Sequence, residues 1–284
     1  MKKTFFIVLG ILLFLAGCSL FAPKPFSPIE TEYPDSLDSS EILLLLRKRH
    51  NEYSHLWARA KISLSGKGMK GKKFFHATLL FQEPDLLRIR GSRMITSTLF
   101  EFILHSGNMA LIINKQDKWY EGTKTQWEAH PEASLGIDPT ILPTSLLVQQ
   151  DLIRLIKRNH FKQARRARNY HLFLETKPDM SQMAYLVRTK DLLVKEAALY
   201  DPEGQMTVRL RILNYEAANG DVLPSKMEAF FPLTGIKADI SVKEYKFPSS
   251  FDPRVFELVP PKGMQRLPLY ELFQSPLEED NLSR

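Results

Sequence analysis

Cysteine is almost absent from this chain, because Cys18 is the only one among 284 residues. A single thiol cannot form an internal disulfide, so an exported protein of this composition must be stabilised by its hydrophobic core. The apolar run at residues 5–16 is also short, at 12 residues, whereas a membrane-spanning helix needs about 20. This run follows Lys2 and Lys3 and is typical of a secretory signal rather than of a permanent anchor.

Motifs that carry metal or nucleophilic chemistry are missing. The seven histidines show neither HxxxH nor HExxH spacing, and no second cysteine could join them at a zinc ion. No GxSxG element occurs. Residues 66–71 match GxGxxG, but a strand rather than a helix is expected to follow, which indicates a hairpin. The acidic residues 278–280 lie in a polar tail that could not position an acid and a base. The sequence therefore predicts no metal, no cofactor and no enzymatic activity.

The net charge of the chain is only mildly positive. The formal net charge is +7, and removing Lys2 and Lys3 with the signal leaves +5. This balance suits a protein beside anionic membrane surfaces and is too small to favour a nucleic acid partner. The basic stretch 157–168 could contact lipid phosphates, although such a run is more often a solvated face.

The residues around Cys18 indicate a covalent lipid. Leu15-Ala16-Gly17-Cys18 resembles the lipobox of bacterial lipoproteins, in which small residues let a peptidase hold the chain as an extended strand. The resemblance implies that the Cys18 thiol receives diacylglycerol, that cleavage leaves Cys18 as the first mature residue, and that its amine is acylated. Several acyl chains together hold a protein firmly to a membrane. The alternative is an ordinary signal peptide with an unrelated cysteine.

The chain is expected to have four parts. Residues 1–17 are the lipoprotein signal peptide, and residues 18–37 are a lipidated, proline-rich tether. Residues 38–267 form one domain, and residues 268–284 are a polar tail.

Hydrophobic periodicity predicts a mainly β domain with a few helices. A capping pattern at Asp38 and Glu41 begins a helix that continues over 42–53. From Leu56 onward the period changes from 3.6 to 2. A second helix is predicted over 145–158, and turn signals separate the remaining segments. The total is about eleven short strands in an antiparallel meander, with no βαβ rhythm.

The order of these elements resembles a known family. The strings WARAKISL, ATLLFQEPDLLRIRG, WYEGTKTQWEAHPEASLGIDPTILPTSLL and FELVPPKG are similar to segments of the LolA/LolB group of periplasmic lipoprotein carriers and receptors. The resemblance covers roughly residues 40–264. It implies a curved antiparallel sheet, like a half barrel, whose hollow is covered by helices and holds acyl chains. It also implies that FELVPPKG forms the closing strand.

Two sets of candidate site residues follow. Apolar strand residues could line an acyl-chain cavity, where each buried methylene contributes roughly 0.8 kcal/mol; they are Leu79, Phe81, Leu87, Ile89, Phe100, Phe102 and Leu104. The family also implies a membrane-insertion loop, which here corresponds to residues 91–96 with Met94 and Ile95 as its apolar pair. The alternative for the strand residues is an ordinary closed core.

The expected function is that of an anchored lipoprotein that binds acyl chains of lipid or lipoprotein. Its expected partners are the membrane, an acylated ligand (lipoprotein or phospholipid) and a soluble periplasmic carrier. Ser19 favours the periplasmic face of the outer membrane, because an aspartate there favours inner-membrane retention in relatives. One alternative is a structural or assembly lipoprotein that binds another envelope protein through its surface. A hydrolase is the remaining alternative.

Overall fold

A computed structural model describes most of the predicted domain, namely residues 39–48, 53–67, 69–94, 97–128, 139, 141–159, 161–167 and 169–274. All of these residues belong to one compact unit. Cys18, the signal peptide and the tether lie outside the described residues, so the four-part division stays a prediction at its N-terminal end. Among the described helices, none is both long and apolar enough to span a bilayer.

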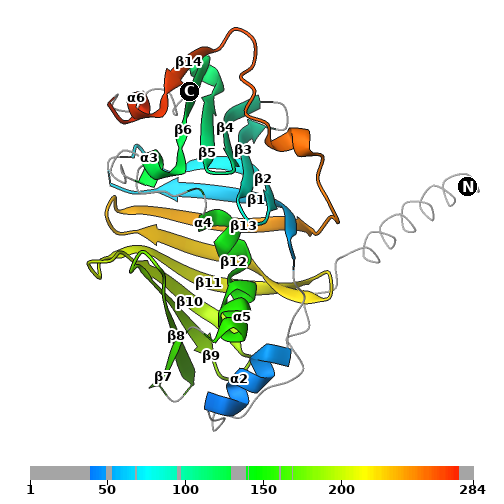
Figure 1. The fold of residues 1–284 in the computed structure, drawn as a ribbon, viewed down its shortest axis with the longest axis vertical. Helices are drawn as coiled ribbons and strands as arrows, with labels where there is room; N and C mark the ends of the chain where they lie inside the picture. The colour runs from blue at the N-terminus through cyan, green and yellow to red at the C-terminus, as the bar shows by residue number, and fades with distance from the viewer. Residues whose placement is uncertain are drawn as a thin grey trace, which may run out of the picture. The chain divides into compact units, whose positions relative to one another are not determined.

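A single open, curved sheet of fourteen strands dominates the fold (Figure 1). Neighbouring strands are antiparallel, except that β14 runs parallel to β6 at one edge. The order across the sheet is β14-β6-β5-β4-β3-β2-β1-β13-β12-β11-β10-β9-β8-β7. The strands are β1 His55–Ser65, β2 Lys73–Gln82, β3 Leu86–Met94, β4 Ser97–His105, β5 Asn108–Ile113, β6 Lys118–Thr123, β7 Lys162–Ala167, β8 Tyr170–Thr176, β9 Gln182–Arg188, β10 Leu193–Tyr200, β11 Met206–Ala218, β12 Asp221–Phe231, β13 Ile236–Lys246 and β14 Gln265–Pro268.

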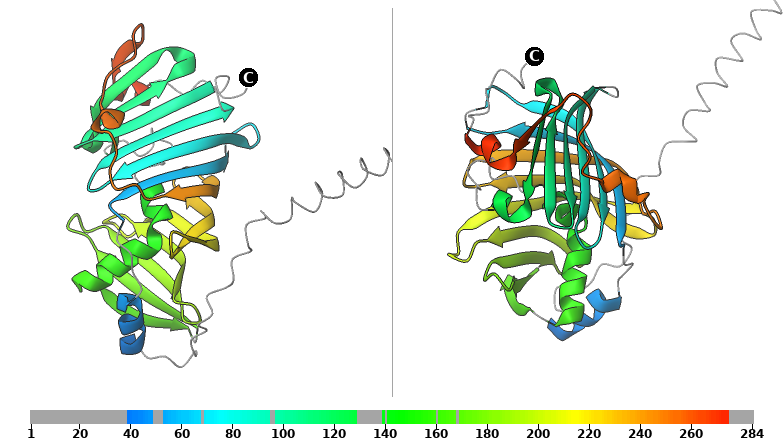
Figure 2. Two further views of the ribbon diagram at one scale, coloured as in Figure 1. Left: turned by 90° about the vertical axis from the view of Figure 1, so that its right-hand side faces the viewer. Right: turned by 45° about the horizontal axis from the view of Figure 1, so that its top comes forward.

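The helices among the described residues are short, and three of them follow one another between β6 and β7. These three are α3, α4 and α5, and they lie on one side of the sheet (Figures 1 and 2). The helical elements are α2 Ser39–Lys48, α3 Lys124–Glu128, α4 Ile141–Leu146, α5 Val148–Arg158, α6 Leu269–Gln274 and the 3-10 turns η1 Asn114–Gln116 and η2 Pro253–Phe256.

β1 lies near the centre of the sheet and shows the alternation that its sequence predicts. Leu56, Ala58, Ala60 and Ile62 are buried on one side of the strand, as their period of two requires. β1 pairs with β2 on one edge and with β13 on the other. The pairing of β1 with β13 therefore joins the two halves of the sheet, which are far apart in sequence.

The mainly β prediction is confirmed, but several elements differ from their expected bounds. The first helix ends at Lys48 rather than at residue 53, and the helix expected over 145–158 is two helices separated by Leu147. The expected eleven strands are fourteen. β7 was not foreseen, because its sequence KQARRA is basic and lacks apolar alternation.

The C-terminal segment also differs from expectation. The stretch FELVPPKG is not a strand: η2 ends at Phe256, and the next strand, β14, begins only at Gln265. Two successive prolines, which lack backbone N–H groups, cannot continue a ladder there. The fold also extends beyond residue 267, where a polar tail was expected, because α6 buries Leu269 and Leu272.

Candidate functional site

The strand register places all seven residues of the predicted cavity on one face of the sheet. Leu79 of β2 pairs with Ile89 of β3, which pairs with Phe102 of β4. The neighbouring rows are Phe81–Leu87–Leu104 and Ala77–Gly91–Phe100. We call this side the inner face. Five of the seven are at most 5% exposed, whereas Phe81 and Phe100 are half-buried.

The inner face continues without interruption into the other half of the sheet. Leu64 of β1 pairs with Ala238 of β13, and the residues in register beyond Ala238 are again apolar. The row contributed by β13, β12, β11, β10, β9 and β8 consists of Ala238, Ala229, Leu210, Ala197, Tyr185 and Phe173. All of these are buried. One apolar surface therefore runs across most of the sheet.

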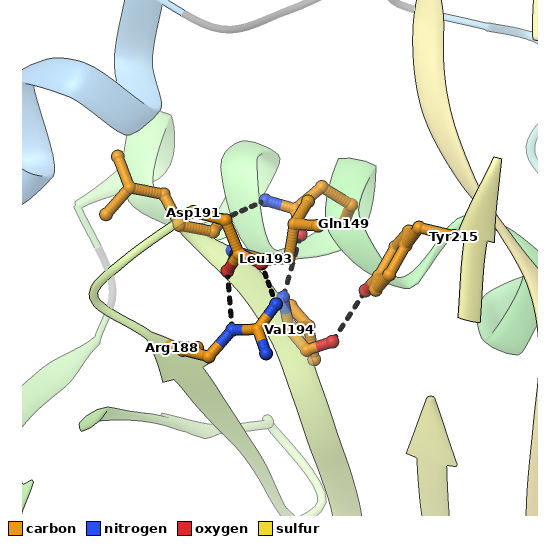
Figure 3. A network of polar contacts seen from close by, with 7 residues as sticks. Gln149, Arg188, Asp191, Leu193, Val194 and Tyr215 are labelled. Atoms are coloured by element: carbon orange, nitrogen blue, oxygen red, sulfur yellow. Dashed lines mark hydrogen bonds and ion pairs between the residues drawn. The ribbon is translucent and has the colours of Figure 1, made fainter. Parts of the chain in front are cut away.

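α5 is fastened to one half of this face by a buried glutamine. The Gln149 side-chain amide donates to the carbonyl oxygen of Leu192 at 3.1 Å, and the backbone N–H of Val194 donates to Gln149 Oε1 at 3.0 Å. The hydroxyl of Tyr215 donates to the carbonyl oxygen of Val194 at 2.6 Å. Figure 3 shows this network between α5 and the start of β10. Because Gln149 is buried, both of its hydrogen bonds are shielded from water.

A second set of polar contacts fastens α5 to the segment before β1. The Gln150 amide and the Arg154 guanidinium both donate to the carbonyl oxygen of Tyr53, at 3.2 and 3.3 Å. Arg154 also forms ion pairs with Glu83, in the turn between β2 and β3, and with Asp151. These contacts tie the helix to the two strands at the centre of the sheet.

Asp151 titrates abnormally in this cluster. Burial raises the pKa of its carboxyl to about 7, against the opposing effect of the Arg154 guanidinium. The carboxylates of Glu83 and Glu175 raise the pKa further, and Lys177 lowers it. The ionised form of Asp151 is therefore disfavoured where the helix meets the sheet.

α3 covers the other half of the inner face through an aromatic contact. The indole of Trp127 packs edge-on against the ring of Phe102, with 6.0 Å between ring centroids. A reciprocal cap begins the helix, since the Thr123 N–H donates to Gln126 Oε1 and the Gln126 N–H donates to Thr123 Oγ1. Trp127 is only 8% exposed. The side chain by which α3 meets the inner face is therefore apolar, while the start of the helix is tied to the β4–β5 turn by a backbone hydrogen bond from the Lys124 N–H to the Gly107 carbonyl oxygen at 2.8 Å.

Half-buried aromatic rings mark one end of the inner face. The rings of Phe75 and Phe100 meet edge-to-face at 5.4 Å. A Cβ at Gly91 would lie 2.2 Å from Phe100 Cε1, so the absence of a side chain at Gly91 gives this ring its place. Both rings lie toward the β3–β4 hairpin.

The predicted insertion loop is mostly strand. β3 continues through Gly91, which pairs with Phe100, and ends at Met94, while β4 begins at Ser97. The loop expected over 91–96 is therefore reduced to residues 95–96. Ile95 and the side chain of Met94 lie outside what the structure describes, so their role as an insertion pair stays a prediction.

A small pocket beside α5 does not suit an acyl chain. Its volume of about 20 Å³ holds about one water molecule. Polar groups of Gln149, Gln150 and Asp221 contribute to its lining. Within the described residues, no group of three or more histidine, cysteine, aspartate or glutamate side chains is placed to hold a metal ion.

The outer face of the sheet carries ion pairs on β3–β4 and on β10–β11. Glu101 accepts from Arg88 at 2.7 Å and from Arg90 at 3.0 Å, and Glu196 pairs with Arg209 and Arg211. Part of this face is covered by residues 247–268, which we call the C-terminal strap.

The C-terminal strap is held by polar and apolar contacts. Arg88 donates to the carbonyl oxygen of Val255 at 2.6 Å, and His105 Nδ1 donates to that of Phe256 at 3.0 Å. Leu258 and Met264 pack on a small outer core of Ala110, Ile112 and Trp119. The strap then ends as β14, beside β6.

Sequence comparison gives no match to a protein-family model or to a curated protein. Solved structures do match. One is a LolA superfamily protein from Nitrosomonas europaea, with 10% identity, a TM-score of 0.50 and coverage of 78% of this chain and 98% of that one. The chain has a LolA-like half-barrel fold. A DUF1329 family protein from Desulfovibrio piger matches with 13% identity, a TM-score of 0.52 and coverage of 77% and 95%.

Two residues that cover the inner face were not predicted from the sequence. Trp127 and Gln149 complete the cover of the inner face, yet neither was singled out. Gln149 lies three residues before Leu152 and so shares its face of α5. That spacing is the sequence signal that could have placed Gln149 against the sheet, although a glutamine is usually expected to be exposed to solvent.

Proposed function

We propose that this protein is a non-enzymatic, lipid-anchored lipoprotein that binds the acyl chains of lipids or lipoproteins against the inner face of its half barrel. One observation carries the proposal: a continuous apolar face, several strands wide, is closed over β4 by the aromatic side chain of Trp127. The fold supports the proposal, because a solved structure with a similar fold is that of a LolA superfamily protein.

Acyl chains would take the place that Trp127 now occupies. Each methylene buried against the inner face contributes roughly 0.8 kcal/mol, so two or three chains bind without any polar contact. Displacing Trp127 from Phe102 breaks an aromatic contact worth about 1 kcal/mol beyond its buried area. The polar clamp at Gln149 would stay closed, because opening it leaves buried amide and carbonyl groups unpaired.

The proposal also includes the lipid anchor on Cys18 and the location of the protein in the cell envelope. Acyl groups on Cys18 hold the protein to the periplasmic face of the outer membrane, where Ser19 favours its release from the inner membrane. A soluble periplasmic carrier delivers an acylated ligand, and Met94 and Ile95 help to insert it. The ligand is a lipoprotein or a phospholipid.

Tryptophan fluorescence tests ligand binding at the inner face. The probe is a dipalmitoylated peptide added to mature chain carrying Cys18→Ser. We expect a red shift of emission, because Trp127 leaves the buried position it now holds beside Phe102. The shift should vanish in Trp127→Phe and persist in Trp57→Phe, whose indole lies under Lys246 elsewhere in the protein. An unchanged spectrum at saturating peptide would contradict the proposal.

A second function is favoured by the close packing of the inner face. Five predicted cavity residues are at most 5% exposed, as in a structural protein whose core stays closed. Such a protein would bind another envelope component through its surface. Cross-linking in cells followed by pull-down would then give a stoichiometric protein partner, and that partner would be retained by a Phe102→Leu variant and by Trp127→Ala alike.

A further inference from the structure

Helix α2 has one buried and one exposed face. Ile42 and Leu46 are fully buried, and the helix packs on α5. Leu44 lies on the opposite side and is 55% exposed. Arg47 and Lys48 follow it at spacings of three and four residues, so the three side chains share one exposed stripe.

The end of α5, on which α2 packs, adds further exposed positive charge to this part of the molecule. α2 lies across the carboxyl end of α5 (Figures 1 and 2). The last turn of α5 carries the exposed Lys157 and Arg158, and Lys162 at the start of β7 is also exposed. Glu41, in the first turn of α2, is the acidic residue on the same helix.

Helix dipoles explain only part of this arrangement. Cations in the last turn of a helix are favourable wherever the helix lies, because they offset the partial negative charge of its carboxyl end. That effect gives no reason for a leucine to project into solvent between them. An exposed leucine next to arginine and lysine can enter a membrane interface while the cations stay at the level of the headgroups, as the two faces of an interfacial helix do.

The position of α2 in the chain brings it near a membrane if Cys18 is lipidated. Residues 19–38 separate Cys18 from α2, and twenty residues span at most about 70 Å. α2 is the first described element after that segment. An anchored chain would therefore hold α2 at a high effective concentration beside the lipid surface.

We propose that Leu44, Arg47, Lys48, Arg158 and Lys162 form a face that docks on anionic lipid headgroups. We call it the basic face. The cations contact lipid phosphates, and Leu44 enters the boundary between headgroups and acyl chains. Docking in this way fixes the orientation of the half barrel against the bilayer. The proposal concerns a surface away from the inner face and does not require that an acylated ligand bind there.

Vesicle sedimentation tests the basic face. Mature chain carrying Cys18→Ser, which has no lipid anchor, is mixed with phosphatidylcholine vesicles with and without phosphatidylglycerol. We expect binding to the anionic vesicles alone, and weaker binding as salt rises. Arg47→Glu with Lys48→Glu should lower the partition coefficient by at least about ten-fold, because two cations that are attracted to the anionic surface are replaced by anions that it repels.

A matched control separates the basic face from general charge attraction. Lys226→Glu with Lys243→Glu makes the same change of charge at two exposed residues of β12 and β13, and should change binding less than two-fold. Leu44→Ser should weaken binding without changing its salt dependence. Equal binding to neutral and anionic vesicles, or equal losses in the two double variants, would overturn the proposal. The Trp127 fluorescence response should be the same in all these variants, so failure of this surface is distinguishable from failure of acyl binding.

Discussion

The two covers of the inner face are built from different interactions. α5 is held by two hydrogen bonds of Gln149, which donates to the Leu192 carbonyl oxygen and accepts from the Val194 N–H of β10. Gln150 and Arg154 also hold α5 by donating to the Tyr53 carbonyl oxygen. α3 meets the same face through the ring of Trp127 on that of Phe102. Hydrogen bonds are directional and costly to leave unmade in a buried place. Apolar contacts can be exchanged for those of another apolar group at little cost.

The difference assigns a role to each half of the sheet. The half under α5, from β8 to β13, is a structural core that should remain closed. In the proposed function, the half under α3, from β1 to β6, is where a ligand chain replaces a protein side chain. Substitutions in the two covers should therefore separate stability from binding.

Gln149→Leu should have the largest effect on stability. The substitution keeps the volume but leaves the Leu192 carbonyl and the Val194 N–H without their partner. We expect a loss of about 3 kcal/mol in the free energy of unfolding, measured by urea denaturation. Affinity for the dipalmitoylated peptide should be unchanged in the folded protein. A loss below about 1 kcal/mol would show that α5 is not clamped as described.

Asp151→Asn should change how stability depends on pH. The pKa of Asp151 is about 7 in the folded protein and near 3.8 when unfolded, so the folded state binds the extra proton between these values. The contribution of Asp151 to the free energy of unfolding should therefore fall as pH rises from about 4 to about 7, by at most about 1.4 kcal/mol per pH unit.

The slope should be smaller in Asp151→Asn, as measured by urea denaturation at several pH values. Asp252→Asn is the control, because hydrogen bonds from Arg254 lower the pKa of Asp252 from its usual value near 3.8. The contribution of Asp252 is therefore lost only below about pH 4, and this variant should keep the wild-type slope between about pH 4 and 7. If wild type and Asp151→Asn show the same slope, the pKa of Asp151 is not raised in the folded protein.

Trp127→Ala should open the inner face without releasing α5. We expect about ten-fold more binding of an apolar fluorescent dye than in wild type, because an indole that covers Phe102 is removed. Gln149→Leu, at native pH and without denaturant, should bind the dye as wild type does. Equal dye binding by the two variants would remove the distinction between the covers.

Glu196→Gln should have the smallest effect. Glu196 pairs with Arg209 and Arg211 on the outer face, where the arginines are 38% and 54% exposed. Such pairs contribute about 0–1 kcal/mol, so the urea midpoint should shift only slightly and peptide affinity should not change. A large loss of affinity would place ligand binding on the outer face.

The sequence predicted the sheet better than its covers. Alternation in β1 and β2 identified one apolar set in each strand, and the ladder register then brought these sets to one face. Register depends on turns and long-range pairing, so local alternation alone could not align Leu79 with Ile89 and Phe102. The pairing of β1 with β13, almost the whole domain apart in sequence, left no local signal.

The covers were harder because their key residues act through tertiary contacts. The role of Gln149 depends on two backbone groups, the Leu192 carbonyl just before β10 and the Val194 N–H within it, and no pattern in the sequence of α5 reveals them. Trp127 lies in a helix of five residues, too short to show a period. β14 has only four residues and is fixed by β6 rather than by its own propensity.

Photo-labelling with a diazirine-bearing fatty acyl chain tests the central claim most directly. The unmodified mature protein is irradiated with the probe, digested and mapped by mass spectrometry. We predict labels on β2, β3 and β4 at inner-face residues such as Leu79, Ile89 and Phe102, with few on β10 beneath α5. Labels confined to the outer face, or spread equally over the surface, would contradict the account.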